Sequence, residues 1–212
     1  MGLSRLRCRD DDGVVRIIGD SSEEEMVACF LLGELTSRRF GAGIRRALAA
    51  AGESERLLTD ADLGDPAANR VRRDLLAVTR GCGENRDVFE DFPGQVRWTR
   101  AVLTPDELAR VRYIEYSYWN ELSGGSRLAS NAAERIRTGV RVFGVSNDRF
   151  IAAARAVRRG DRFSPLILAG PRPETLVCLE GHLRLTAYAL AGFPVDVECL
   201  VGTAQLMDRW AR

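Results

Sequence analysis

Residues 176–187 read Leu-Val-Cys-Leu-Glu-Gly-His-Leu-Arg-Leu-Thr-Ala. This stretch has the pattern of a strand, a turn and a helix, and it is the most informative part of the sequence for predicting the fold. An apolar strand runs into a turn with a single glycine, Gly181, and the pattern that follows predicts a helix to Ala191. The first backbone N–H groups of such a helix have no intrahelical partner and carry the positive end of the helix dipole. The turn is therefore a predicted anion site.

Side chains around this turn extend the hypothesis. Arg184 lies in the first helical turn, where its guanidinium could contact a phosphate in bidentate fashion. Glu180 and His182 flank the turn and are the candidate catalytic acid or base. The predicted phosphate-binding residues are Gly181, Leu183, Arg184 and Thr186. The alternative is an ordinary strand-to-helix turn, with His182 on the surface and Arg184 in an ion pair.

The sequence on either side of the turn alternates between strand and helix patterns. Strands are expected at 140–145, 165–169, 175–179 and 194–201, with helices at 148–159, 181–191 and 204–210. Residues 139–212 are therefore predicted to form a small α/β module.

The chain before residue 139 is predicted to be different. Residues 1–20 form a polar segment, and residues 21–138 a helical region with helices at 23–35, 36–51, 66–80, 104–122 and 127–138. Thr104-Pro105-Asp106-Glu107 is a capping box with proline at the first helical position. Residues 84–103 are expected to be an irregular loop held by aromatic side chains. The predicted fold class is α+β.

A second group of polar side chains lies near the end of the predicted helix 104–122. Tyr116, Asn120, Ser123 and Arg127 could line a substrate pocket, because a Gly-Gly turn before a helix can also hold an anion. The alternative is a simple junction between two helices.

Composition limits the chemistry. The chain has 212 residues and a net charge of +1, and all 31 basic residues are arginine, a bias typical of bacterial GC-rich coding. The absence of lysine excludes Schiff-base chemistry and a phosphate-loop lysine, and a single histidine excludes an HExxH metal site. The balanced charge does not favour a nucleic-acid partner.

Cysteine content and hydropathy indicate the compartment. The five cysteines contain no CxxC pair, so reduced thiols in the cytoplasm are expected, with Cys178 and Cys199 buried and Cys82 more exposed. The apolar runs are too short for a membrane span, and the N-terminus lacks the apolar core of a secretory signal. We therefore expect a cytoplasmic protein without a membrane partner.

The motif Glu180-Gly181-His182-Leu183-Arg184, together with Pro165–Leu168 and Pro194–Val197, resembles the ParB/sulfiredoxin fold over roughly residues 139–201. In that superfamily a Gly-x-x-Arg turn binds the phosphates of a nucleotide. The closest pattern is the Asp-Gly-His-His-Arg motif of ParB-like free serine kinases, with Glu for Asp and Leu for the second His. Sulfiredoxins carry a catalytic cysteine at the position of His182, so sulfinic-acid reduction is not expected. About 28 residues follow the motif, fewer than the helix-turn-helix domain of partition proteins needs.

The resemblance implies a small-molecule enzyme, a phosphotransferase that uses a nucleoside di- or triphosphate with Mg²⁺. Its metal ligands are unknown, and an oligomer or a partner protein is compatible with the sequence. Two alternatives stay open: a nucleic-acid-binding ParB-like regulator or nuclease, and a non-catalytic subunit or binding module of a biosynthetic enzyme.

Overall fold

The computed structural model describes residues 15–212. The expected polar start of the chain therefore lies outside the described residues up to residue 14, as does Cys8. The fold is α+β, as predicted: N-terminal helices are followed by a six-stranded mixed sheet with helices between its strands. No helix in residues 15–212 has the length and apolar character that a membrane crossing requires.

The sheet has the strand order β1-β2-β6-β4-β5-β3. Its strands are β1 (Arg16–Asp20), β2 (Arg97–Leu103), β3 (Arg112–Tyr113), β4 (Leu166–Gly170), β5 (Val177–Glu180) and β6 (Val197–Thr203). Strands β4 and β6 are parallel, as are β3 and β5, and the other neighbours are antiparallel. Three of the six strands precede residue 139, so the sheet crosses the boundary that the sequence suggested.

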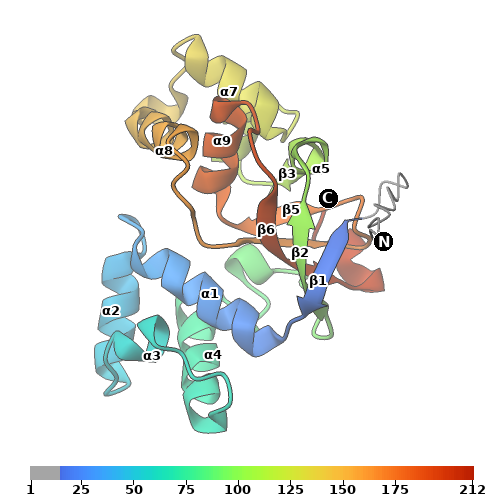
Figure 1. Ribbon diagram of the computed structural model, residues 1–212. Coiled ribbons are helices and arrows are strands. Elements are labelled where there is room, and N and C mark those ends of the chain that lie inside the picture. The colour runs from blue at the N-terminus through green and yellow to red at the C-terminus, as the bar shows by residue number, and fades with distance from the viewer. Residues whose placement is uncertain (1–14) are drawn as a thin grey trace, which may run out of the picture.

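Helices cover both faces of the sheet. Figure 1 shows α1 (Glu23–Leu35), α2 (Gly41–Ala50), α3 (Arg56–Thr59) and α4 (Pro66–Arg80) gathered on one side. On the other side lie α7 (Ala129–Arg137), α8 (Asp148–Arg158) and α9 (His182–Ala191). The remaining helices are α5 (Pro105–Arg110) and α6 (Ser117–Ser123), with short 3-10 turns η1 (Asp87–Phe89), η2 (Val142–Gly144) and η3 (Gln205–Asp208).

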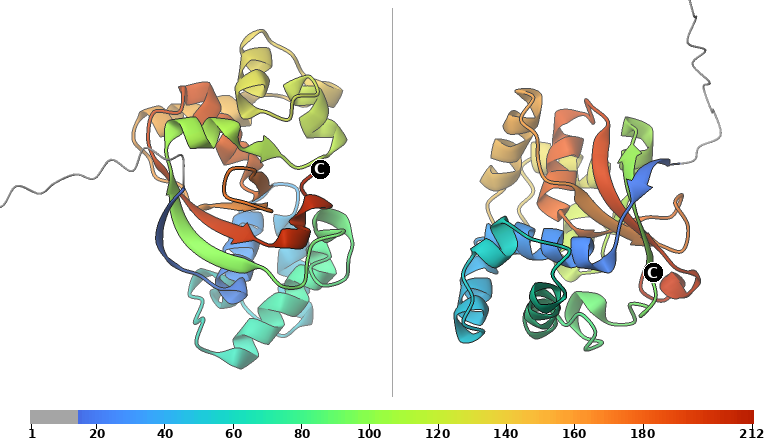
Figure 2. Two further views of the ribbon diagram at one scale, coloured as in Figure 1. Left: turned by 90° about the vertical axis from the view of Figure 1, so that its right-hand side faces the viewer. Right: turned by 60° about the horizontal axis from the view of Figure 1, so that its bottom comes forward.

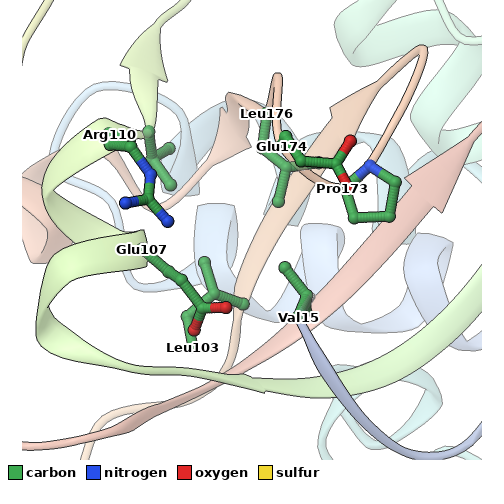
Figure 3. A pocket seen from close by; sticks show the side chains of 8 residues that line it. Val15, Leu103, Glu107, Arg110, Pro173, Glu174 and Leu176 are labelled. Carbon is green, nitrogen blue, oxygen red and sulfur yellow. The ribbon is translucent and has the colours of Figure 1, made fainter. Parts of the chain in front are cut away.

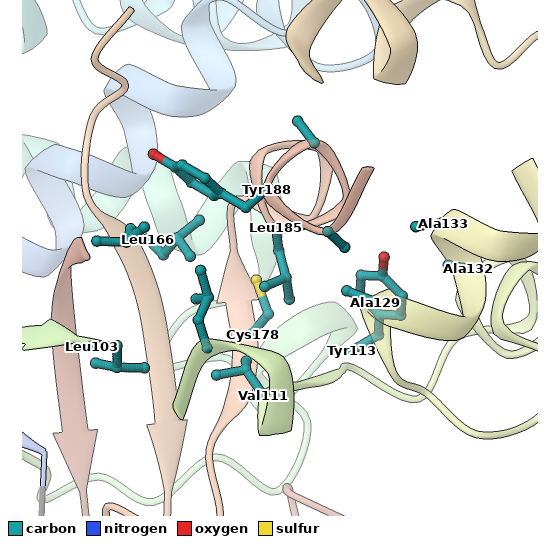
Figure 4. Close-up of a cluster of buried hydrophobic side chains, with 14 of the residues drawn as sticks. Leu103, Val111, Tyr113, Ala129, Ala132, Ala133, Leu166, Cys178, Leu185 and Tyr188 are labelled. Carbon is teal, nitrogen blue, oxygen red and sulfur yellow. The ribbon is translucent and has the colours of Figure 1, made fainter. Parts of the chain in front are cut away.

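Successive side chains of the central strands point to opposite faces of the sheet and pack into two separate hydrophobic cores. On β4, Leu166 and Leu168 join the core under α9, whereas Ile167 and Ala169 join the core under α1. Figure 4 shows the first of these cores between the sheet, α9 and α7. A strand buried on both faces reads as a continuous apolar run, and this explains why residues 166–169 contain no polar side chain.

The capping box predicted at Thr104 is confirmed, and α1 and α4 also have side-chain caps. The Ser22 side chain accepts a hydrogen bond from the Glu25 backbone N–H at the start of α1. Asp65 caps α4, which begins with Pro66 and ends at Gly81 in the left-handed conformation. Thr104 and Glu107 form the reciprocal capping box of α5.

Two predicted elements in the middle of the chain are wrong. The loop expected at 84–103 extends only to residue 96. Residues 97–103 form β2, which pairs with β6 along its whole length. The helix expected from 104 to 122 ends at Arg110, since Arg112 and Tyr113 pair with β5 as the edge strand β3. In both places pairing with a distant strand overrides the local pattern.

Three further expectations need correction. Residues 140–145 form the turn η2 instead of a strand, with Phe143 exposed and in a left-handed conformation at φ 51°. The closing helix expected at 204–210 is the 3-10 turn η3. Cys82 is buried, not exposed, whereas the predicted burial of Cys178 and Cys199 on strands is confirmed.

The strands β1, β2 and β6 curve together beside the helices (Figure 2). The end of the chain lies against the segment between α4 and β2, where the Trp210 Nε1–H donates to the Val88 carbonyl at 2.7 Å. The last residues of the chain thereby fix a loop that the local sequence leaves irregular.

Candidate functional site

The predicted anion turn connects β5 to α9. Gly181 has φ 102°, a left-handed conformation that favours glycine, and no side chain caps the helix that follows it. A Cβ atom at Gly181 would lie 2.5 Å from Leu166 and 2.9 Å from Nη2 of Arg184. The turn therefore requires glycine for its backbone angle and for its close neighbours.

The Arg184 guanidinium folds back over this turn and is held by protein groups. Its Nη2 lies 3.1 Å from Oε2 of Glu180, and Nη1 donates to the Ser164 hydroxyl. Both charged side chains are nearly buried, with 12% and 16% of their surface exposed. The guanidinium therefore faces the Glu180 carboxylate, not an open anion site, in this structure.

Helix α1 closes the other side of the ion pair. A Cβ atom on Gly33 would come within 2.5 Å of Oε1 of Glu180 and 3.9 Å of Nη2 of Arg184. The absence of a side chain at residue 33 lets the carboxylate lie against the helix backbone. Two segments separated by almost 150 positions thus meet at one ion pair.

The helical half of the molecule adds a second ion pair, between Glu34 and Arg80. Both side chains are buried. Burial raises the pKa of the Glu34 carboxyl to about 7; Arg80 acts to lower it and the Glu180 charge to raise it further. The Arg80 guanidinium also lies 4.0 Å from the ring centroid of Phe40.

The sequence analysis missed this second pair. A signal for Glu34 was present, because it is an acidic residue near the end of the apolar run Met26–Leu35. A charged side chain inside such a run needs a buried partner. The identity of that partner, Arg80, depends on how α1 packs against α4, which a linear pattern does not contain.

His182 packs against the aromatic rings of Trp119 and Tyr113, which also stack on each other. Its imidazole stacks on Trp119 at 4.9 Å between centroids and lies 6.1 Å from the Tyr113 ring, and Nε2 is shielded without a hydrogen-bond partner in residues 15–212. Burial lowers the pKa of His182 to about 3, and the Arg80 and Arg184 charges act in the same direction. The imidazole is therefore neutral at pH 7 and is a weak base.

The other predicted anion ligands have different surroundings. Thr186 is fully buried: its hydroxyl donates to the His182 carbonyl at 2.7 Å and lies 2.7 Å from the Tyr113 hydroxyl. Its side chain is turned into the core and away from the turn. Leu183 is half-buried against the core, so only its backbone N–H is left as an anion donor.

The four residues of the predicted substrate pocket divide into two pairs. Ser123 is buried and joins α6 to the next turn, accepting from the Arg127 backbone N–H at 2.9 Å. Arg127 is also buried, and its Nε donates to the Tyr113 carbonyl at 2.8 Å. These two residues therefore hold the junction between α6 and α7.

Tyr116 and Asn120 retain free surface or free polar atoms. Tyr116 is 38% exposed. Partial burial raises the pKa of its hydroxyl, and the Arg80 charge acts to lower that pKa. Asn120 has a shielded Oδ1 that lacks a hydrogen-bond partner in the described part of the chain. Of the four predicted pocket residues, Tyr116 is the exposed one, and Asn120 Oδ1 and Arg127 Nη2 are buried atoms without a partner among the described residues.

A small hollow beside α5 is a poor alternative site. Figure 3 shows it between Glu107, Arg110 and Glu174. Its volume is about 10 Å³, and a single water needs about 10–15 Å³. It has no room for a substrate.

Among residues 15–212, no three His, Cys, Asp or Glu side chains lie close enough together to hold a metal ion. The Glu180 and Glu34 carboxylates are each engaged by an arginine. Comparison of the chain with known protein families, curated proteins and solved structures gives no match. The resemblance to the ParB/sulfiredoxin fold stays a prediction.

The two glycines Gly33 and Gly43 provide a test of the contact between α1 and Glu180. Gly43→Ala in α2 should raise the free energy of unfolding by up to about 1 kcal/mol, because alanine is the better helix former and its Cβ meets only Arg46 Nη2 at 4.0 Å. Gly33→Ala should instead lower the free energy of unfolding relative to the wild type, because the added Cβ displaces the Glu180 carboxylate and this cost exceeds the gain in helix propensity. Urea denaturation measures both, and equal stabilisation by both variants would contradict the contact.

The single histidine allows a direct test of its environment. The imidazole C–H resonances in an NMR titration should stay unchanged from pH 8 to pH 4.5, because the folded-state pKa of His182 is lowered to about 3. The same resonances in the urea-unfolded chain should titrate near pH 6.5, the ordinary value. A midpoint near 6.5 in the folded protein would show that the ring is solvated.

The same shift has a consequence for stability. Between pH 6.5 and about pH 3 the unfolded chain binds a proton at His182 that the folded chain excludes. The contribution of His182 to stability is therefore present above pH 6.5 and is lost as the pH falls through this window.

Proposed function

We propose that this protein is a small-molecule enzyme, a nucleotide-dependent phosphotransferase whose phosphate site is the Gly181 turn. The observation that carries the proposal is the position of Arg184, with its guanidinium over the uncapped start of α9 and paired with Glu180. The Arg184 guanidinium already holds one anionic group, the carboxylate of Glu180. A phosphate group of a nucleotide would take the place of that carboxylate.

The exchange follows from the chemistry of the groups. Helix N–H groups and a guanidinium fork both prefer a phosphate, which offers several acceptor oxygens at once. On binding, Arg184 would turn from Glu180 to the nucleotide, and the freed carboxylate would be next to the reacting phosphate. Ser164, which also accepts from Arg184, helps to hold the guanidinium in place.

Glu180 then takes the role of general base. The carboxylate accepts the proton of an acceptor hydroxyl, and the oxygen of that hydroxyl forms a bond to the terminal phosphorus of the nucleotide. The bond from this phosphorus to its bridging oxygen breaks, and the products are a phosphorylated acceptor and a nucleotide shorter by one phosphoryl group. His182, neutral at pH 7, would orient the acceptor through Nε2.

Tyr116 and Asn120 are the residues we assign to the acceptor side of this site. Asn120 belongs to α6, as does Trp119, which stacks on His182, and Tyr116 directly precedes this helix. Mg²⁺ would enter with the nucleotide and be coordinated by its phosphate oxygens, because the described side chains form no metal cluster of their own.

A second candidate, a non-catalytic binding module, is favoured by one observation. Arg184 and Glu180 satisfy each other, so the turn is also stable as a purely structural element. The two candidates differ in whether a nucleotide displaces the carboxylate.

The Tm measured with and without ADP or ATP and Mg²⁺ distinguishes the enzyme from the non-catalytic binding module. At about 100 times Kd, a ligand stabilises the folded state by about 2.7 kcal/mol, which raises the Tm of a chain of this size by roughly 5–10 °C. Arg184→Ala should abolish the shift, whereas Arg172→Ala, a change at an exposed arginine, should preserve it.

Glu180→Gln provides the complementary variant. Loss of the competing carboxylate charge frees the guanidinium, so this variant should bind the nucleotide at least as tightly as the wild type. A wild-type protein that shows no shift with either nucleotide contradicts the proposal and leaves the structural role of the turn.

A further inference from the structure

A cavity opens at the N-terminal end of α1. Its volume is about 250 Å³, and its walls come from the first turns of α1 and from the loop between α4 and β2. An apolar cavity of about 150 Å³ can already bind a benzene molecule. This cavity therefore has room for one ring with a short side chain.

The walls are mainly aromatic and aliphatic. Phe89 and Trp98 are almost completely buried, and Phe92 contacts both, at 5.2 and 6.5 Å between ring centroids. Met26 of α1 closes the side opposite to the loop. With Glu23 and Asn85 also among the lining residues, the cavity suits a ligand that combines an apolar ring with a polar group.

The loop that forms one wall is fixed by hydrogen bonds. The Arg86 guanidinium donates to the carbonyls of Ala77 and Val78 at 2.6 and 3.0 Å, and the Asp91 N–H donates to the Asn85 side chain at 2.8 Å. Trp210 holds Val88 from the end of the chain. The cavity is therefore preformed, which reduces the entropy lost when a ligand binds.

Charge at the cavity comes from Glu23. Among the residues that line it, Glu23 is the one with a carboxyl group, and burial raises the pKa of the Cys82 thiol to about 11. The neighbouring acids Glu24 and Glu25 pair with Arg73 and Arg100. Within residues 15–212, Glu23 forms no ion pair, so its carboxylate is available to a ligand.

We propose that this cavity binds a small organic cation, an amine with one apolar ring. The ring would lie against Phe92, Pro93 and Val96, which line the cavity with partly exposed side chains, and the ammonium group would face the Glu23 carboxylate.

This cavity is separate from the phosphate site proposed above. Glu23 and Gly33 are ten residues apart on α1, which corresponds to about 15 Å along the helix axis. Binding of an amine here neither requires nor excludes a nucleotide at the Gly181 turn.

Three probes of similar shape and different charge test the proposal by isothermal titration at pH 7. They are 2-phenylethylammonium, the neutral 2-phenylethanol and the anionic 3-phenylpropionate. The ammonium should bind at least tenfold more tightly than the alcohol, a difference of about 1.4 kcal/mol, and the carboxylate should bind most weakly. Chemical-shift changes of the loop 82–98 should locate the bound ring.

Glu23→Gln should remove the preference, leaving the ammonium and the alcohol with equal affinity. Glu24→Gln is the matched control, because it removes a charge from the same helical turn without touching the cavity. Equal binding of all three probes to the wild type, a preference that survives in Glu23→Gln, or no saturable binding up to several millimolar would each overturn the proposal.

Discussion

The ion pair between Arg184 and Glu180 is the contact on which the rest of the site depends. It joins the start of α9 to the end of β5, and it is pressed against α1 at Gly33. A buried ion pair is tolerated only where its geometry is good and its remaining polar atoms find partners. Here glycine at residues 33 and 181 provides the space, and Ser164 provides a further partner for the guanidinium. The ion pair thereby adds a charged contact to the apolar core that joins α1 to the sheet.

Helix α1 shows how environment gives different properties to the same side chain. Glu34, near its C-terminal end, is buried beside Arg80, and its pKa is raised to about 7. Glu23, at its N-terminal end, is exposed and lies at the rim of the cavity beside the loop 82–98. One helix thus presents a carboxylate to an aromatic cavity and a backbone surface to the candidate phosphate site.

The sequence predicted what local chemistry determines. Caps such as Thr104 and the glycine turn at residue 181 depend on a few neighbouring residues, and both are present in the structure. Strand β2 was missed because it carries arginine and tryptophan in no simple alternation, and its pairing partner lies about 100 residues away. The site was predicted only in part for the same reason. Arg184 and Glu180 are neighbours in sequence, whereas Gly33 and Arg80 reach the turn through tertiary packing.

The central claim is that a phosphate replaces the Glu180 carboxylate at the start of α9, and backbone amide NMR tests it most directly. Titration of the ¹⁵N-labelled protein with ADP and Mg²⁺ should shift the amide resonances of His182, Leu183 and Arg184 together with that of Gly33, which lies against the displaced carboxylate. Saturation with unchanged resonances at these four residues, or shifts confined to another part of the molecule, would contradict the account.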